Sequence, residues 1–179
     1  TNLIGVKIAS EKINKLKAKQ MPISKEEIEL FEQNLPFKLT NAQERTIKEI
    51  SDDISLTKPM RRLVQGDVGS GKTVVAAVSM YISAKNNTQS VLLCPTEVLA
   101  EQHFKNFSAW FKNSNIKIEL LTGKMPVSKR RGIYQDLEHG VIDILIGTHA
   151  VFQDKVKMKN LGLVVVDEQQ RFGVKQRFD

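Results

Sequence analysis

One eight-residue stretch constrains this chain more than any other feature: Gly66-Asp67-Val68-Gly69-Ser70-Gly71-Lys72-Thr73. It fits the phosphate-binding pattern G-x-x-x-x-G-K-[ST] at every fixed position. Residues 62–65 before it are predicted to form a short buried strand, and the small apolar residues 74–81 after it a helix packed on a sheet. Because a strand, a glycine-rich loop and a helix in this order are the context that the motif needs, the stretch predicts a nucleotide-binding site.

Each part of this loop has a chemical task. The glycines let backbone N–H groups close around phosphate oxygens, an approach that a Cβ atom would block. Lys72 would bring a positive charge to the β- and γ-phosphates, and Thr73 would offer its hydroxyl to Mg²⁺. The plain alternative is a fortuitous glycine-rich turn, and the predicted flanking strand and helix argue against it.

A second stretch supplies the acidic partner that such a loop needs. The apolar residues 163–166 are followed directly by Asp167 and Glu168. Asp167 would hold Mg²⁺, and Glu168 would polarise or deprotonate the attacking water. The alternative is a pair of solvated acids at a strand end. A water-activating glutamate favours an ATP hydrolase over a nucleotide kinase, and the absence of an Asn-Lys-x-Asp motif disfavours a small GTPase.

The rest of the chain alternates strand and helix patterns. Residues 1–20 are predicted to be helical and lysine-rich, and capping boxes at Ser24/Glu27 and Thr40/Gln43 predict two further helices. Short apolar strands separated by helices indicate a parallel sheet covered on both faces, in the α/β class. The strands are expected at residues 90–94, 116–121, 142–146 and 161–166, and the helices between them at 97–111 and 128–137.

Composition adds little about partners. The net charge is +7, but residues 1–20 carry five lysines against one glutamate, which is +4, and leave only +3 for the remainder.

The single cysteine, Cys94, lies in an apolar run and is expected to be a buried strand residue. Because no disulfide can form within the chain, the chain fits a reducing compartment. No apolar run approaches membrane-spanning length, and the missing initiator methionine suggests a fragment.

Six segments together resemble superfamily 2 helicases, specifically the RecG branch. They lie at residues 35–43, 62–73, 95–104, 121–123, 147–150 and 166–174, so the resemblance covers residues 35–179 closely and 1–34 loosely. The transcription-repair coupling factor Mfd has a similar Asp-Val-Gly phosphate loop and Arg-Phe-Gly-Val tail. The Val-Gln-Gly, Pro-Thr-Glu and Asp-Glu-Gln elements look closer to RecG.

The resemblance implies a RecA-like P-loop domain of an ATP-dependent DNA helicase. Residues 35–179 would be the first RecA-like domain, ending shortly after the Asp-Glu-Gln-Gln motif, and residues 1–34 a helical linker from a missing wedge domain. ATP and Mg²⁺ would be bound against a second RecA-like domain in cis. The protein would be a monomeric bacterial cytoplasmic enzyme that acts on branched or duplex DNA and no membrane. An Mfd-like translocase and a non-catalytic nucleotide-dependent interaction domain remain alternatives.

The resemblance also assigns residues. Lys72, Asp167 and Glu168 would be catalytic, and Phe37 and Gln43 would contact adenine, although Thr40 and Gln43 also fit a plain helix cap and both roles can hold. Three loops after strands would contact the phosphates of a DNA strand. The alternative for these loops is plain helix capping, and the alternative for His149 is a turn or packing role. Their residues are Pro95, Thr96, Glu97, Gln102, Thr122, Gly123, Thr148 and His149. Gln170, which replaces the usual histidine, and Arg171 would couple the ATP site to DNA.

The aromatic residues near position 107 invite a base-stacking role, which the spacing disfavours. Phe104, Phe107 and Phe111 fall at i, i+3 and i+7, the spacing of a helix face that packs on a sheet, and Trp110 lies off that stripe. The basic run 129–131 is expected to be a solvated helix face rather than a DNA contact.

Overall fold

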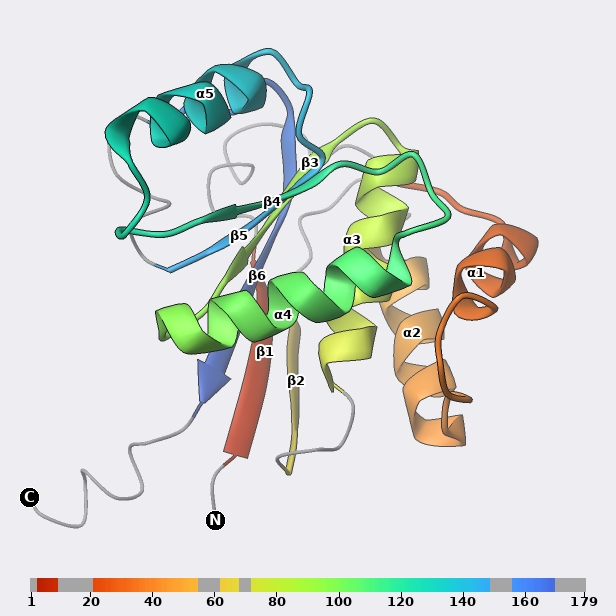
Figure 1. The fold of residues 1–179 in the computed structure, drawn as a ribbon. Helices are drawn as coiled ribbons and strands as arrows, with labels where there is room; N and C mark the ends of the chain where they lie inside the picture. The colour runs from red at the N-terminus through yellow and green to blue at the C-terminus, as the bar shows by residue number, and fades with distance from the viewer. Residues whose placement is uncertain (1–2, 10–20, 55–61, 68–71, 149–155, 170–179) are drawn as a thin grey trace, which may run out of the picture.

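The computed structural model describes residues 3–9, 21–54, 62–67, 72–148 and 156–169, and within these it describes side chains for 21–54, 72–148 and 156–167. The elements are β1 (Leu3–Ala9), α1 (Lys25–Glu32), α2 (Asn41–Ile54), β2 (Arg62–Asp67), α3 (Lys72–Lys85), β3 (Gln89–Leu93), α4 (Glu97–Trp110), β4 (Ile118–Leu121), α5 (Val127–Glu138), β5 (Ile144–Gly147) and β6 (Leu161–Gln169) (Figure 1). The predicted α/β class is confirmed, and the bounds of most predicted elements are within about two residues of those observed.

The strands form one six-stranded sheet in the order β2-β1-β6-β3-β5-β4. Strand β6 pairs in parallel with β3, β3 with β5, and β5 with β4, which gives the predicted parallel core. Strand β1 is antiparallel to both of its neighbours, β2 and β6, so the sheet is mixed. Because β2 and β6 both run opposite to β1, they run in the same direction as each other.

The predicted helix over residues 1–20 is wrong for residues 3–9, which form strand β1. The β-branched residues Ile4, Val6 and Ile8 recur at every second position, the period of a strand rather than of a helix. An N-terminal linker that is helical throughout is therefore corrected: its first described part belongs to the sheet. Residues 10–20 lie outside the described part of the chain.

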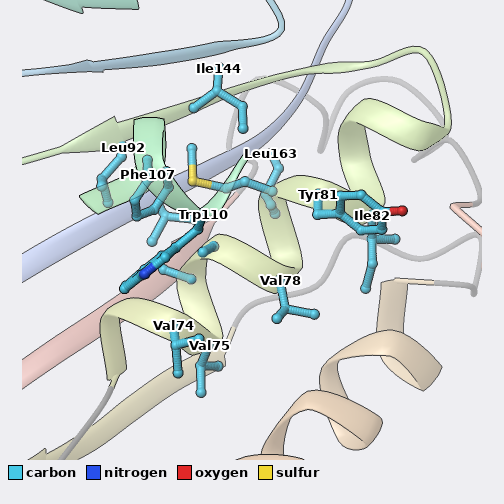
Figure 2. Close-up of a cluster of buried hydrophobic side chains, with 14 of the residues drawn as sticks. Val74, Val75, Val78, Tyr81, Ile82, Leu92, Phe107, Trp110, Ile144 and Leu163 are labelled. Atoms are coloured by element: carbon cyan, nitrogen blue, oxygen red, sulfur yellow. The ribbon is translucent and has the colours of Figure 1, made fainter. Parts of the chain in front are cut away.

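Helices cover both faces of the sheet. Alternate strand residues Leu92, Ile144, Ile146, Leu163 and Val165 pack in one core with α1 to α4, and Figure 2 shows its side chains gathered between the helices and the strands. The intervening residues Val91, Leu93 and Leu145 pack with Ile133 and Leu137 of α5 in a second core. Figure 1 shows α5 and α4 on opposite sides of the sheet.

Helix α1 is joined to this body by aromatic contacts. Phe31 stacks on Tyr81 of α3 with ring centroids 4.7 Å apart, and it packs on Phe111 at the same centroid distance. The predicted cap at its start is confirmed, because the Glu27 N–H donates to Ser24 Oγ at 3.2 Å. Within the described residues, no helix combines the length and the apolar character needed to cross a membrane.

Candidate nucleotide and DNA site at the sheet edge

Parallel pairing brings the ends of β3, β5 and β4 level with the carboxyl-terminal part of β6 at one edge of the sheet. Val166 of β6 pairs with Leu93 of β3, Leu93 with Gly147 of β5, and Gly147 with Leu121 of β4. The next residue along each strand direction therefore lies in the following row. That row consists of Asp167, Cys94, Thr148 and Thr122. The register thus brings the predicted Mg²⁺ ligand and two of the predicted DNA-contacting threonines to the same edge.

The glycine-rich loop begins at this edge too. Val6 of β1 pairs with both Val64 of β2 and Asp167 of β6, so Gly66 and Asp67 end β2 just beyond the level of Asp167. With β1 between them, β2 and β6 lie two strand spacings apart, or about 10 Å. Lys72 is the first residue of α3 and is buried, and Thr73 is half-buried. The middle of the loop, residues 68–71, lies outside the described residues.

Asp167 is a buried carboxylate with its two oxygens in different environments. It is 8% exposed, and Oδ2 lies 2.7 Å from Nε2 of His103. Oδ1 is also buried and has no hydrogen-bond partner among the described residues. A buried carboxylate oxygen without a donor is costly, and a hard cation or its bound water would satisfy it. Asp167 therefore fits the predicted Mg²⁺ role, whereas the side chain of Glu168 is not described.

His103 is the site residue that the sequence interpretation missed. The buried residues of α4 are Ala100, His103, Phe107 and Trp110, at i, i+3, i+7 and i+10. The predicted stripe was therefore rotated: Phe107 and Phe111 are buried as expected, but Trp110, expected off the stripe, is only 8% exposed. The signal was a histidine at helical spacing from three apolar residues, which placed it toward the sheet rather than toward solvent.

Cys94 lies beside this pair, and its predicted burial is confirmed at 1% exposure. Its sulfur and one ligand atom each of His103 and Asp167 lie within 4.8 Å of one another. Burial, with a smaller contribution from the Asp167 charge, raises the pKa of the Cys94 thiol to about 12. The thiol therefore stays protonated at neutral pH, and the short contact in this group is the hydrogen bond between His103 and Asp167.

The predicted adenine-contacting residues lie at the start of α2. The Thr40 N–H donates to Gln43 Oε1 at 2.9 Å, and the Gln43 N–H donates to Thr40 Oγ1 at 3.1 Å, so the predicted capping box is confirmed. Phe37 is 43% exposed and meets the Trp110 ring edge-on at a centroid distance of 5.9 Å. A partly exposed aromatic ring is compatible with a stacked base.

Two of the predicted DNA loops are connected to each other. Thr96 caps α4, because its Oγ1 accepts from the Leu99 N–H at 3.2 Å. Glu97 Oε1 accepts from the Gly123 N–H at 3.0 Å, and its Oε2 lies 3.9 Å from Lys124 Nζ. Of the remaining predicted DNA contacts, Pro95 and Gln102 are exposed, Thr122 is buried, Thr148 is half-buried, and His149 lies outside the described residues. The predicted coupling residues Gln170 and Arg171 lie outside them too.

Known proteins resemble this chain over most of its length. The model of the DEAD/DEAH box helicase family matches residues 40–179. The ATP-dependent DNA helicase RecG of Aquifex aeolicus is 45% identical over 174 residues, covering 97% of this chain and 22% of that protein. RecG of Thermotoga maritima is 46% identical over 179 residues (98% and 23%), and RecG of Bacillus subtilis 48% identical over 154 residues (86% and 23%).

A solved structure shows the same arrangement of elements. The structure of RecG bound to a three-way DNA junction superposes with a TM-score of 0.78 at 43% identity, covering 86% of this chain and 21% of that one. The chain spans about a fifth of the length of the curated relatives it matches.

Proposed function

This chain belongs to the DEAD/DEAH box helicase family, and on that premise we propose that it is the first motor domain of a RecG-like ATP-dependent DNA helicase. The whole enzyme would remodel branched DNA such as stalled replication forks and recombination junctions. The observation that carries this proposal is the common edge of the sheet, where Asp167 of β6 lies level with Cys94, Thr148 and Thr122, the residues that follow the ends of β3, β5 and β4. A buried acid for the nucleotide and threonines for DNA phosphates share one row.

The nucleotide half would work through the loop and β6. Lys72, at the start of the 14-residue helix α3, would stabilise negative charge on the phosphates together with the positive end of the helix dipole. Thr73 and Asp167 would hold Mg²⁺, which when bound neutralises phosphate charge during hydrolysis. Glu168 would orient and deprotonate the attacking water. Phe37 and Gln43 would hold adenine, with the Gln43 amide nitrogen as donor while its oxygen caps α2.

The DNA half would work through the loops after the strands. The Thr96 hydroxyl accepts the Leu99 N–H, and the same hydroxyl can donate its hydrogen to a phosphate. Glu97 carries the wrong charge for a phosphate contact, so we assign it the task of holding the second loop through Gly123. Pro95, Gln102, Thr122, Thr148 and His149 stay candidate DNA contacts, and Gln170 and Arg171 stay candidate coupling residues.

The parts outside this chain complete the proposal. A second RecA-like domain and a wedge domain in cis would close the ATP site and engage the branch, and the linker role of residues 1–34 belongs to the same proposal. The relatives support RecG over Mfd, and the RecG structure with a three-way junction supports branched DNA as the partner. We further propose that the enzyme is a monomer in the bacterial cytoplasm, where DNA is located.

Strand separation of a three-way junction tests this proposal. The full-length protein should unwind the junction with ATP and Mg²⁺ and leave a linear duplex of the same sequence largely paired. The isolated 179-residue chain should bind nucleotide weakly and unwind neither substrate. Robust unwinding by the isolated chain would contradict the proposal that it is half of a motor. Displacement of stalled RNA polymerase without junction unwinding would favour the Mfd-like alternative.

A further inference from the structure

The bond between His103 and Asp167 joins the two halves of the proposed site. His103 lies on α4, the helix that begins at the proposed DNA loop 95–97, and Asp167 lies on β6. Their atoms Nε2 and Oδ2 are 2.7 Å apart, and both side chains are about one-tenth exposed. We propose that His103 is a positioning residue, through which α4 fixes the orientation of the Asp167 carboxylate for Mg²⁺. This inference rests on the proposed ATPase function.

The chemistry of the pair favours this role. The carboxylate of an aspartate turns easily about its terminal torsion, so an unsupported Asp167 would present its oxygens in many orientations. A donor on Oδ2 fixes the plane of the carboxylate and leaves Oδ1, which has no hydrogen-bond partner among the described residues. Ligands of metals are commonly oriented in this way by hydrogen bonds from a second layer of residues.

The geometry also fixes which nitrogen of His103 carries a proton. A carboxylate oxygen can only accept, so Nε2 must donate. Nδ1 is buried and has no partner in the described part of the chain. The bond is therefore specific to one nitrogen and to one side of the ring.

The helix that carries His103 is fixed both before and after that residue. Thr96 caps its first turn, Glu97 ties that turn to Gly123, and Phe107 and Trp110 anchor the following turns in the core. His103 is seven residues, or about 10 Å along the axis, from the cap. If loop 95–97 moves and carries the whole of α4 with it, the His103 N–H that donates to Asp167 therefore moves as well.

Binding of Mn²⁺, a spin-active substitute for Mg²⁺, tests the role without measuring hydrolysis. Electron paramagnetic resonance would count bound Mn²⁺ in the full-length protein with a non-hydrolysable ATP analogue. His103→Leu substitutes an apolar side chain of similar bulk that has no donor, and we expect about 10- to 100-fold weaker Mn²⁺ binding. His103→Gln can place an amide N–H near the position of Nε2, and we expect it to recover most of that loss.

Controls separate positioning from stability. Ile133→Val reduces packing in the second core, under α5 and away from α4, and its Mn²⁺ affinity should stay within about twofold of wild type. His103→Asn keeps a polar side chain too short to reach Oδ2; it should bind Mn²⁺ as weakly as His103→Leu, and it decides the matter if the leucine variant does not fold. Wild-type affinity in folded His103→Leu or His103→Asn would overturn the inference. Absence of nucleotide-dependent Mn²⁺ binding in wild type would instead overturn the proposed function.

Discussion

Glu97 Oε1 accepts a hydrogen bond from the backbone N–H of Gly123 at 3.0 Å, and this contact joins the loop after β3 to the loop after β4. The other carboxylate oxygen lies 3.9 Å from Lys124 Nζ. A Cβ atom on Gly123 would lie 3.3 Å from Glu97 Oε1, so glycine leaves the room that this approach needs. Two of the proposed DNA loops are thus one connected surface.

Removing this contact should loosen that surface. Glu97→Ala should lower the free energy of unfolding by about 1 kcal/mol and weaken junction binding several-fold, because the Gly123 N–H loses its acceptor. Glu97→Gln keeps an acceptor oxygen and should bind DNA at nearly wild-type affinity. Fluorescence anisotropy with labelled junction DNA measures the difference, and Glu101→Ala, an exposed glutamate on the same helix, is the control. Equal losses in the alanine and glutamine variants would show that the charge, not the bond, matters.

Gln43 can be tested for its two proposed roles separately. Gln43→Glu keeps an oxygen that accepts from the Thr40 N–H but loses the amide donor for adenine. We expect it to retain the stability of wild type and to lose about 1–3 kcal/mol of ATP binding. Gln43→Ala should lose both the cap, about 1 kcal/mol, and the affinity. Calorimetric titration with ATP and urea unfolding separate these effects, and unchanged ATP affinity in Gln43→Glu would limit Gln43 to the capping box.

Local signals predicted the parts of the fold that depend on neighbouring residues. The helix cap at Ser24, the capping box at Thr40 and the apolar runs of the parallel strands are short-range patterns, and the structure confirms them. Strand β1 was missed because its partners, residues 62–67 and 164–169, are far away in sequence. Scattered apolar residues among lysines fitted a helix as well, and only the pairing decides between the two.

The site residues also divide into those that a contiguous motif identifies and those that only packing identifies. The loop 66–73 and the pair Asp167-Glu168 are contiguous motifs, so sequence alone could nominate them. His103 shares a helix face with Ala100, Phe107 and Trp110, but α4 also offered a stripe through Phe104, Phe107 and Phe111. Local spacing alone did not choose between these two faces. Trp110 packs edge-on against Phe37, which lies outside α4, and no pattern within the helix encodes that contact.

Two glycines should respond oppositely to the same substitution. A Cβ on Gly162 would lie 2.6 Å from Met21 Cε and from Thr88 Cβ, whereas a Cβ on Gly132 meets nothing within 4 Å. Gly162→Ala should therefore destabilise the fold by about 1–3 kcal/mol through overpacking. Gly132→Ala, within helix α5, should stabilise it by about 0.5–1 kcal/mol. Urea denaturation measures both, and a neutral Gly162→Ala would contradict the tight packing of β6 against residue 21.

Asp143 should make stability fall as pH rises. Burial raises the pKa of its carboxyl above the ordinary value, more than the hydrogen bond from the Lys117 N–H lowers it. The folded state then holds the proton more tightly than the unfolded state, so this contribution is full below the ordinary pKa and is lost as pH rises through the raised pKa. Asp143→Asn keeps an acceptor but does not titrate, so it should gain stability relative to wild type between acid and neutral pH. Unfolding curves across that range measure the stability of Asp143→Asn relative to wild type, with the exposed Glu138→Gln as control. A relative stability of Asp143→Asn that increases toward acid pH would contradict the predicted direction.

We propose that this sheet edge hydrolyses ATP in response to DNA. The most direct test is steady-state ATP hydrolysis by the full-length protein with and without a three-way junction, in wild type, Lys72→Ala and Glu168→Gln. Junction DNA should stimulate wild type and the exposed control Lys129→Ala, while both site variants should lose at least about 100-fold in rate. Glu168→Gln should still bind ATP. DNA-stimulated hydrolysis that survives in both site variants would contradict the account.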